Sequence, residues 1–483
     1  MGMSLNKLKG LEPGKVFEFF ELLCSVPHGS DNTSQISAIC CRFAGERGLR
    51  FHQDELNNVI IYKGGSAGYE AHEPVIIQGH LDMVTVKEAG CDIDLEKDGL
   101  RLRHDERFVF AEGTSLGADD AIAVAMAMAV LDSDDIPHPP IEAVFTVNEE
   151  TGMDGAVGLD VSRLSAKRML NIDSEEEDVI TCGCAGGLRV YGDFPLRQSI
   201  RCTNAARIGI TGLCGGHSGS EIDKGRANAI KLMGRLLHRI SSELEFGIVE
   251  LNGGEKDNAI ANSAQAVISC ADIPLLKRIV SNFEAEVKNE FSVTDPELAL
   301  SCIELGAASR PVSERACTDQ LVFVLYQCPN GVRTMSAHIP GLVQTSLNFG
   351  VMSTENDSVR LTFCLRSSVS SQKQELAEQL RSLIEHCGGT YSSGGDYPAW
   401  EYTESSPLRG TACAAYEKLY GKKPAVSVIH AGLECGLFTD KIKGLDCISF
   451  GPDILNIHTT GERLDIASTE RTYALLLEML KHM

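Results

Sequence analysis

The sequence has no stretch suited to crossing a membrane or to directing export. Its 483 residues contain no apolar run approaching about 20 residues, the length that a membrane-spanning helix requires. The amino-terminal stretch MGMSLNKLKG lacks the apolar core of a signal peptide. We therefore expect a cytoplasmic protein with no membrane partner.

Positive charge is also scarce. The chain has 44 lysines and arginines against 67 aspartates and glutamates, which gives a formal net charge of −23. A protein of this charge is repelled by the phosphates of nucleic acids, so we expect no nucleic-acid partner. The excess of carboxylates favours cation binding, although net charge alone cannot locate a site.

Paired cysteines are missing as well. The 17 cysteines are odd in number and include no C-x-x-C pair. This pattern argues against a disulfide framework and against a zinc site built from thiolates. The cysteine pattern is consistent with a protein that resides in a reducing compartment.

Length and residue pattern predict two domains. At 483 residues the chain is long for a single hydrophobic core. At both ends of the chain, short apolar runs alternate with helical segments, which predicts an α/β domain with a mostly parallel sheet between helices. The predicted strands of this domain are 58–64, 74–84, 141–147, 168–173 and 446–452, and its predicted helices are 13–27, 34–48, 117–133 and 406–421.

The middle of the chain has a different pattern. Strands with alternating polarity and amphipathic helices follow one another there, and a strand–strand–helix order occurs twice. The predicted strands are 188–196, 206–213, 341–353 and 358–368, the predicted helices are 227–244, 274–291 and 372–389, and a further strand falls within 258–273. We therefore expect a catalytic domain made of 1–186 and 399–483, with an inserted lid domain, a doubled α+β unit, at 187–398.

Polar side chains gather where the predicted strands end or a helix begins. They are His80 and Asp82 after PVIIQG, Asp119 and Asp120 at a helix start, Glu149 and Glu150 after FTVN, Asp173 after RMLNI, and His458 in a late loop. The carboxyl ends of parallel strands form the ligand crevice of an open sheet. Imidazole and carboxylate groups without thiolates form a coherent ligand set for divalent metals such as zinc.

Each of these residues also has an ordinary structural interpretation. Asp119 fits a helix N-cap, the pair Glu149–Glu150 fits a solvated turn, and His458 fits a loop histidine. If each of these residues had only its ordinary role, it would be a coincidence that all of them lie at equivalent places in one sheet. The coincidence favours a common site.

The motifs HLDMV, GADD, NEETG, NID, GGHSG and NIH, in this order, resemble those of the dinuclear zinc peptidase family that includes carboxypeptidase G, peptidase T and the aminoacyl-histidine dipeptidases. The last group is the most similar, because the sequence also has HAGLECGLF at 430–438 and a large inserted region. The resemblance covers essentially the whole chain. One departure is TTGER after His458, where relatives often have Ser-Pro-Asp or Ser-Pro-Asn; the histidine itself is present.

The resemblance implies a centre with two divalent metal ions. His80 and Asp173 would bind one ion, Glu150 and His458 would bind the other, and Asp119 would bridge both. Zinc is the expected metal, and manganese and cobalt are chemically admissible alternatives.

The resemblance also implies roles beside the metals. Asp82 would orient His80, as a carboxylate commonly does for a metal-bound imidazole. Glu149 would be the general base. The peptide bond between Asp119 and Asp120 would be cis.

For substrate binding, the resemblance points to the inserted domain. His217 in GGHSG would stabilise the transition state, and Asn258 and Arg366 would hold the terminal carboxylate of the substrate. Arg366 suits a bidentate grip on a carboxylate. Glu434 in HAGLECGLF would meet the free amine of the substrate.

Together these features predict a two-zinc metallopeptidase that hydrolyses unblocked dipeptides, namely Xaa-His and β-alanyl-His compounds. An aminotripeptidase and an N-acyl amino acid deacylase are alternatives on the same site. A non-catalytic binding relative is the alternative from another class, and the intact set of motif residues argues against it. A homodimer is compatible with the resemblance but is not required by it.

Overall fold

The computed structural model describes residues 6–483, which form two compact units. The first unit contains the chain up to Cys184 together with Tyr402–Val428 and Leu433–Met483, and the second contains Ala185–Glu401 and Ile429–Gly432. The sequence placed the limits at 186 and 398, and it did not predict that residues 429–432 belong to the second unit. They do so because the backbone N–H of Ala185 donates to the carbonyl groups of Ile429 and Ala431.

The first unit is built on an eight-stranded sheet with the order β1-β2-β6-β3-β7-β19-β8-β18. The central strands β6, β3, β7 and β19 run parallel, as the sequence predicts, and antiparallel pairs flank them. The strands are β1 Arg50–Gln53, β2 Val59–Lys63, β3 Val75–His80, β6 Ile141–Thr146, β7 Arg168–Asn171, β8 Val179–Cys184, β18 Ala425–Ile429 and β19 Asp446–Ser449. A smaller antiparallel sheet contains β4 Leu102–His104, β5 Phe108–Ala111, β20 Ile454–Leu455 and β21 Arg463–Asp465.

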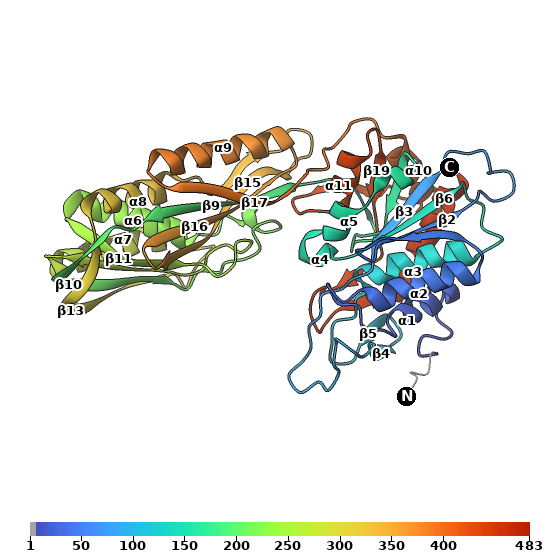
Figure 1. The fold of residues 1–483 in the computed structure, drawn as a ribbon, viewed down its shortest axis with the longest axis horizontal. Coiled ribbons are helices and arrows are strands. Elements are labelled where there is room, and N and C mark those ends of the chain that lie inside the picture. The colour runs from blue at the N-terminus through green and yellow to red at the C-terminus, as the bar shows by residue number, and fades with distance from the viewer. Residues whose placement is uncertain (1–5) are drawn as a thin grey trace. The chain divides into compact units, whose positions relative to one another are not determined.

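Helices cover both faces of the eight-stranded sheet. One face packs against α1 Gly14–Leu23, α2 Ser34–Glu46, α3 Ala118–Asp132, α10 Pro407–Tyr420 and α12 Ile466–Lys481, all of which contribute to one hydrophobic core. The Ala- and Met-rich helix α3 is buried along its whole length from Ala118 to Leu131, which explains why its sequence is apolar nearly all round. In Figure 1, α1, α2 and α3 lie along this face, where α1 packs on α3 and Phe19 of α1 contacts Phe43 of α2. On the other face, α11 Glu434–Lys441 packs on β19, β8 and the short helix α5 Asp154–Gly158.

The second unit is built on a nine-stranded sheet whose order is β13-β10-β12-β11-β15-β16-β9-β17, with β14 paired to β15. Its strands are β9 Gly186–Pro195, β10 Gln198–Thr211, β11 Phe246–Gly253, β12 Ala264–Cys270, β13 Ala299–Ser313, β14 Gly331–Met335, β15 Val343–Glu355, β16 Ser358–Ser367 and β17 Thr390–Tyr397. Its α-helices are α6 Ala229–Glu243, α7 Ile273–Glu290, α8 Arg315–Gln327 and α9 Ser370–His386 (Figure 1). The two strand–strand–helix repeats expected from the sequence therefore share one continuous sheet.

The helices of this unit pack on one face of its sheet. Along β16, Val359, Leu361, Phe363 and Leu365 alternate into the hydrophobic core beneath the helices. Because side chains alternate across a strand, Arg366 follows on the opposite face. Arg366 is paired in register with Ser346 of β15, so both polar side chains lie on the face opposite the α-helices. The alternation therefore separates the core from the polar residues that the sequence assigned to substrate binding.

Several elements were not predicted. The strand β13 has 15 residues, includes GAASRP, and lies at an edge of its sheet, where it shows little alternation between apolar and polar residues. The helices α8 and α12 were also missed. Within 258–273, residues 258–263 precede the strand β12 rather than belonging to it.

Gly79 fits the sheet closely against the start of α3, and we predict that a side chain there is destabilising. A Cβ atom at Gly79 would lie 2.6 Å from Oδ2 of Asp120 and 2.7 Å from Cβ of Ala123. We expect Gly79→Ala to lower the free energy of unfolding in urea by about 1–3 kcal/mol, the usual cost of overpacking. Gly410→Ala in α10 is the control, since nothing lies within 4 Å of its Cβ position. Equal stability of the two variants would contradict the prediction.

Across residues 6–483, no helix combines the length and the apolar character needed to cross a membrane.

Candidate metal centre and catalytic residues

A first group of possible metal ligands lies at the ends of two neighbouring strands. His80 ends β3, Asp173 follows β7, and Asp119 stands near the beginning of α3. The Nε2 atom of His80 lies 3.1 Å from Oδ1 of Asp119 and 3.8 Å from Oδ1 of Asp173. All three side chains are buried, and their ligand atoms lie within 4.8 Å of one another. This spacing suits a single ion.

A second group shares Asp119. The Nε2 atom of His458 lies 3.2 Å from Oδ2 of Asp119 and 2.9 Å from Oε1 of Glu150. Glu150 belongs to the short helix α4 Glu149–Gly152 after β6, whereas His458 comes from a loop near the end of the chain with a φ of 61°. The two oxygens of Asp119 thus face different histidines, which is the arrangement that a bridging carboxylate needs.

The electrostatics of the two groups fit divalent cations. Burial raises the pKa of Asp173 to about 7, and the nearby Asp119 and Glu150 add to this effect. Hydrogen bonds with Asp119 and Glu150 raise the pKa of His458 to about 10. Oδ2 of Asp173 is buried without a hydrogen-bond donor, and Oε1 of Glu150, also buried, faces the His458 imidazole at 2.9 Å. Buried carboxylate oxygens of this kind are costly unless a cation or donor balances them, so the residues present fit two bound metal ions.

The backbone around Asp119 agrees with the expectation from the sequence. The peptide bond between Asp119 and Asp120 is cis, as predicted. The carboxylate of Asp120 accepts a hydrogen bond from the backbone N–H of His80 at 3.2 Å. Asp120 therefore ties the end of β3 to the start of α3, a contact that the sequence did not reveal.

Asp82 contacts more than the imidazole that it was predicted to orient. Its Oδ1 lies 3.6 Å from Nδ1 of His80, while its backbone carbonyl oxygen lies closer to that nitrogen, at 3.0 Å. Its carboxylate also accepts hydrogen bonds from the hydroxyl of Ser30 and from the backbone N–H groups of Glu149 and Glu150. Asp82 is thus placed to fix both His80 and the start of α4.

Glu149 lies next to both ligand groups but belongs to neither of those found among residues 6–483. Burial raises the pKa of Glu149 well above its usual value, and the carboxylates of Asp173, Glu434 and Glu150 add to this effect. The two neighbouring glutamates therefore differ: the carboxylate of Glu150 contacts His458, and the carboxylate of Glu149 remains available for proton transfer.

Glu434 does not fit its predicted role. Its side chain is 0% exposed inside the first unit, where Oε2 accepts hydrogen bonds from Gln78 at 2.5 Å and from Thr146 at 2.6 Å. Burial raises its pKa to about 8. Burial of this kind argues against direct contact with a substrate amine and favours a structural role, in which Glu434 links β3 and β6 beneath the metal ligands.

His217 lies in the second unit with a defined ring orientation. Its Nδ1 atom accepts hydrogen bonds from the backbone N–H groups of Gly219 and Ser220 at 3.3 and 3.2 Å. Burial lowers the pKa of His217, and the nearby Arg366 lowers it further. A neutral imidazole that accepts at Nδ1 carries its proton at Nε2, so Nε2–H is available as a donor.

Arg366 and Asn258 lie near this histidine within the same unit. The backbone N–H of Ser218 donates to the carbonyl of Asn258, which places that asparagine on the segment beside His217. Arg366 is 8% exposed; its Nη1 donates to the hydroxyl of Tyr397 at 3.2 Å, and its Nε is buried without an acceptor. This geometry suits a carboxylate-binding arginine.

His430 was not singled out from the sequence. Its Nε2 atom lies 2.7 Å from the hydroxyl of Ser346, and its Nδ1 is buried without a partner. Burial lowers its pKa to about 4, and Arg366 and His217 contribute. The HAGLECGLF motif therefore contributes a neutral imidazole to this polar cluster, although the sequence pointed to Glu434.

Comparisons with known proteins agree with these features. A family model described as peptidase family M20/M25/M40 matches residues 76–482. The cytosol non-specific dipeptidase of Escherichia coli (strain K12) is 36% identical over 481 residues, which cover 99% of each chain. The crystal structure of aminoacylhistidine dipeptidase from Vibrio alginolyticus matches with a TM-score of 0.91 and 34% identity, over 100% of this chain and 99% of that one.

A more distant structure shares the fold. Aminopeptidase PepT from Bacillus cereus matches with a TM-score of 0.57 and 16% identity, and the match covers 98% of both chains. The sequence-based prediction of the family is confirmed, because the family model and the relative from E. coli each cover most of the chain. The chain belongs to peptidase family M20/M25/M40 and is a hydrolytic enzyme of the metallopeptidase class.

Proposed function

We propose that this enzyme hydrolyses unblocked dipeptides, among them Xaa-His and β-alanyl-His compounds, with two divalent metal ions. The observation that carries the proposal is the position of Asp119, whose two carboxylate oxygens lie 3.1 Å from His80 and 3.2 Å from His458. The similarity to two proteins named as dipeptidases supports a dipeptide as the substrate. Zinc is the metal that we propose, because imidazole and carboxylate ligands suit it.

The metal ligands of the proposal are the two groups that share Asp119. His80 and Asp173 would hold one ion, and Glu150 and His458 would hold the other. When bound, two such ions polarise the scissile carbonyl and lower the pKa of a water molecule toward about 7. Asp82 stabilises this arrangement, since it contacts both His80 and the backbone of Glu150.

Glu149 is the proposed general base. It removes a proton from the attacking water and then delivers that proton to the nitrogen of the leaving amine, so one carboxylate serves both halves of the reaction. Its place beside Glu150 supports this role, because one short helix then carries both the proposed metal ligand and the proposed base.

The residues of the second unit are proposed to act on the substrate. The Nε2–H group of His217 donates to the developing oxyanion. Arg366 and Asn258 bind the terminal carboxylate of the dipeptide, with the buried guanidinium supplying charge and paired donors. The buried Nε of Arg366, which has no acceptor, supports the assignment of an anionic ligand.

A substrate panel tests the function. Purified enzyme loaded with zinc is incubated with Xaa-His dipeptides, β-alanyl-His, tripeptides and N-acylated amino acids, and free amines are quantified. We expect hydrolysis of the unblocked dipeptides. Preferential hydrolysis of tripeptides would favour an aminotripeptidase, and hydrolysis restricted to N-acylated substrates would replace the proposal with a deacylase.

Arg366→Lys tests the binding of the terminal carboxylate. Lysine keeps the positive charge but lacks the planar paired donors of arginine. We expect KM for a free dipeptide to rise by about tenfold or more, since a charge-assisted hydrogen bond contributes about 1.5–3 kcal/mol. Arg360→Lys on the same strand is the control, because Arg360 pairs with Asp193 at the surface. For a dipeptide amide, which lacks the carboxylate, KM should change little when Arg366 is replaced. Equal KM increases for the free dipeptide and the amide would contradict the assignment.

We propose a cytoplasmic location. The relative from E. coli carries the word cytosol in its name, and a chain with 17 cysteines is best kept in a reducing compartment.

A further inference from the structure

The carboxylate of Glu462 holds the backbone just before Asp119. Its Oε2 atom accepts hydrogen bonds from the N–H groups of Leu116 and Gly117 at 2.8 and 3.1 Å, and its Oε1 atom accepts one from Ala118 at 2.8 Å. The side chain is 3% exposed. Three consecutive N–H groups thus converge on one buried carboxylate, which is the geometry of a backbone anion nest.

This contact joins two distant parts of the chain. Glu462 lies four residues after His458, in the loop that leads into β21, while residues 116–118 lead directly into Asp119. The backbone N–H of Glu462 donates to the carbonyl of Thr459, so the loop between His458 and Glu462 is a closed turn. One side chain therefore connects a segment that carries Asp119 to a segment that carries His458.

The loop before Asp119 needs such a support. Gly117, the residue before α3, has a φ of 65°, in the left-handed region, and has no side chain that could cap the helix itself. Without Glu462, three buried N–H groups would lose their acceptor, at a cost of about 1–3 kcal/mol for each that stays unpaired. The segment would have to move to find other partners, and Asp119 would move with it.

We propose that Glu462 is a positioning residue that sets Asp119 against His458 and thereby fixes the affinity of the Asp119–Glu150–His458 group for its metal ion. The inference rests on the proposed two-metal function. Glu462 belongs to neither ligand group, and it acts through the backbone of residues 116–118. Partners that orient metal ligands in this indirect way typically change metal affinity by about 10–100-fold when they are removed.

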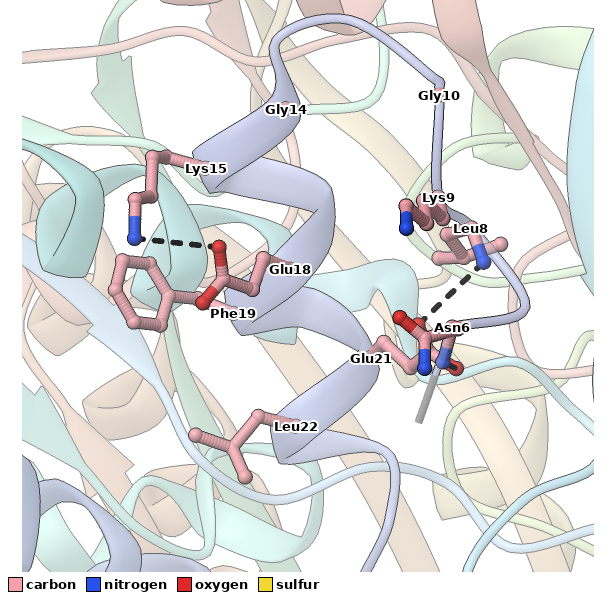
Figure 2. Close-up of a pocket in the computed structure, with 10 residues that line it drawn as sticks. All are labelled: Asn6, Leu8, Lys9, Gly10, Gly14, Lys15, Glu18, Phe19, Glu21 and Leu22. Atoms are coloured by element: carbon pink, nitrogen blue, oxygen red, sulfur yellow. Dashed lines mark hydrogen bonds and ion pairs between the residues drawn. The ribbon is translucent and has the colours of Figure 1, made fainter. Parts of the chain in front are cut away.

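Glu462→Gln is the variant that tests the proposal, and Glu21→Gln is its matched control. Glutamine keeps the size of the side chain but offers one acceptor oxygen, and its amide NH₂ must face an N–H group. Glu21 in α1 is also buried and accepts hydrogen bonds from three consecutive backbone N–H groups, those of Asn6, Lys7 and Leu8. Figure 2 shows Glu21 turned toward this amino-terminal segment, beside a cavity of about 570 Å³.

The measurement is a zinc titration of the metal-free proteins in competition with a chromophoric chelator, combined with thermal unfolding before and after metal addition. We expect wild type and Glu21→Gln to bind two ions with the same affinities. In Glu462→Gln one of the two binding steps should have a Kd about 10–100-fold higher. Both variants should unfold at a lower temperature than wild type when metal-free, so stability alone does not separate them.

The outcomes are distinct. Fewer than two ions in the wild type would overturn the two-metal function and this inference with it. Two ions in the wild type and unchanged affinities in Glu462→Gln would overturn the inference alone. Where Glu462→Gln does not fold, Glu462→Asp replaces it, since aspartate keeps both oxygens but is one methylene too short to reach residues 116–118. Wild-type affinities in Glu462→Asp would then overturn the inference.

Discussion

Replacement of Glu149 by glutamine is expected to reduce kcat for an Xaa-His dipeptide by about 10²–10⁴-fold, the usual contribution of a general acid–base group. Metal content should remain at the wild-type level, because Glu149 belongs to neither ligand group among residues 6–483. KM should change little, since proton transfer stabilises the transition state rather than the bound substrate. Steady-state kinetics and metal analysis of the same preparation measure all three quantities.

The effect is large because glutamine nearly matches glutamate in shape but cannot accept the proton. The backbone N–H of Glu149 would still donate to Asp82, so the start of α4 and the neighbouring Glu150 should keep their places. Glu142→Gln provides the control: Glu142 is a buried glutamate on β6 whose carboxylate accepts hydrogen bonds from Ser165 and Ala166, away from the centre.

Two results would contradict the role of Glu149. Wild-type activity in Glu149→Gln would exclude it as the base. A loss of activity accompanied by the loss of one metal ion would make Glu149 a ligand instead.

Much of the first unit could be predicted from the sequence because its central strands are short, apolar and buried on both faces. In β3 and β6 every residue is buried and most are apolar, and the polar motifs HLD and NEE follow at or just after their carboxyl ends. His80, Glu149 and Asp173 were found by this signal. Their convergence then follows from the parallel order of β6, β3 and β7.

Contacts between distant segments carried no such signal. Glu434 looked like a residue of a Gly-rich turn, and its burial depends on Gln78 and Thr146, which lie hundreds of residues earlier. Glu462 stands in the TTGER loop, where the sequence drew attention to a missing proline rather than to the glutamate. The position of Glu462, four residues after His458, hinted at a role near the site. The sequence could not show its partners, because the backbone that it supports lies at residues 116–118. In the second unit, β13 was missed because an exposed edge strand need not alternate.

The structure also redirects one assignment of substrate contacts. A polar residue in a Gly-rich motif was expected to face the substrate, and in HAGLECGLF that residue was Glu434. The motif instead divides between the units: His430 belongs to the second unit, and Glu434 is buried in the first. A sequence pattern identifies the motif, but it does not show to which of the two units each residue of the motif belongs.

Asp119→Asn is expected to have an effect at least as large as that of Glu149→Gln. Asp119 is the one residue shared by the two ligand groups, and its oxygens lie 3.1 Å from His80 and 3.2 Å from His458. Asparagine has the same shape but is neutral and offers one oxygen, so it cannot bind two ions at once. We expect metal content to fall from two ions per chain to one or fewer. Because the loss of a single oxyanion donor already costs about 10²–10³-fold, the loss of a metal electrophile should reduce kcat by more than about 10³-fold.

The control for Asp119→Asn is Asp465→Asn in the same unit. Asp465 is 5% exposed and accepts a hydrogen bond from the backbone N–H of Ser468 at the start of α12, so it matches Asp119 in burial and in its place at a helix start. Its replacement should lower stability and leave two ions per chain. Metal analysis after gel filtration distinguishes the two variants. Two tightly bound ions in Asp119→Asn would show that the carboxylate does not bridge, and each ion would then be held by the remaining pairs, His80 with Asp173 and Glu150 with His458.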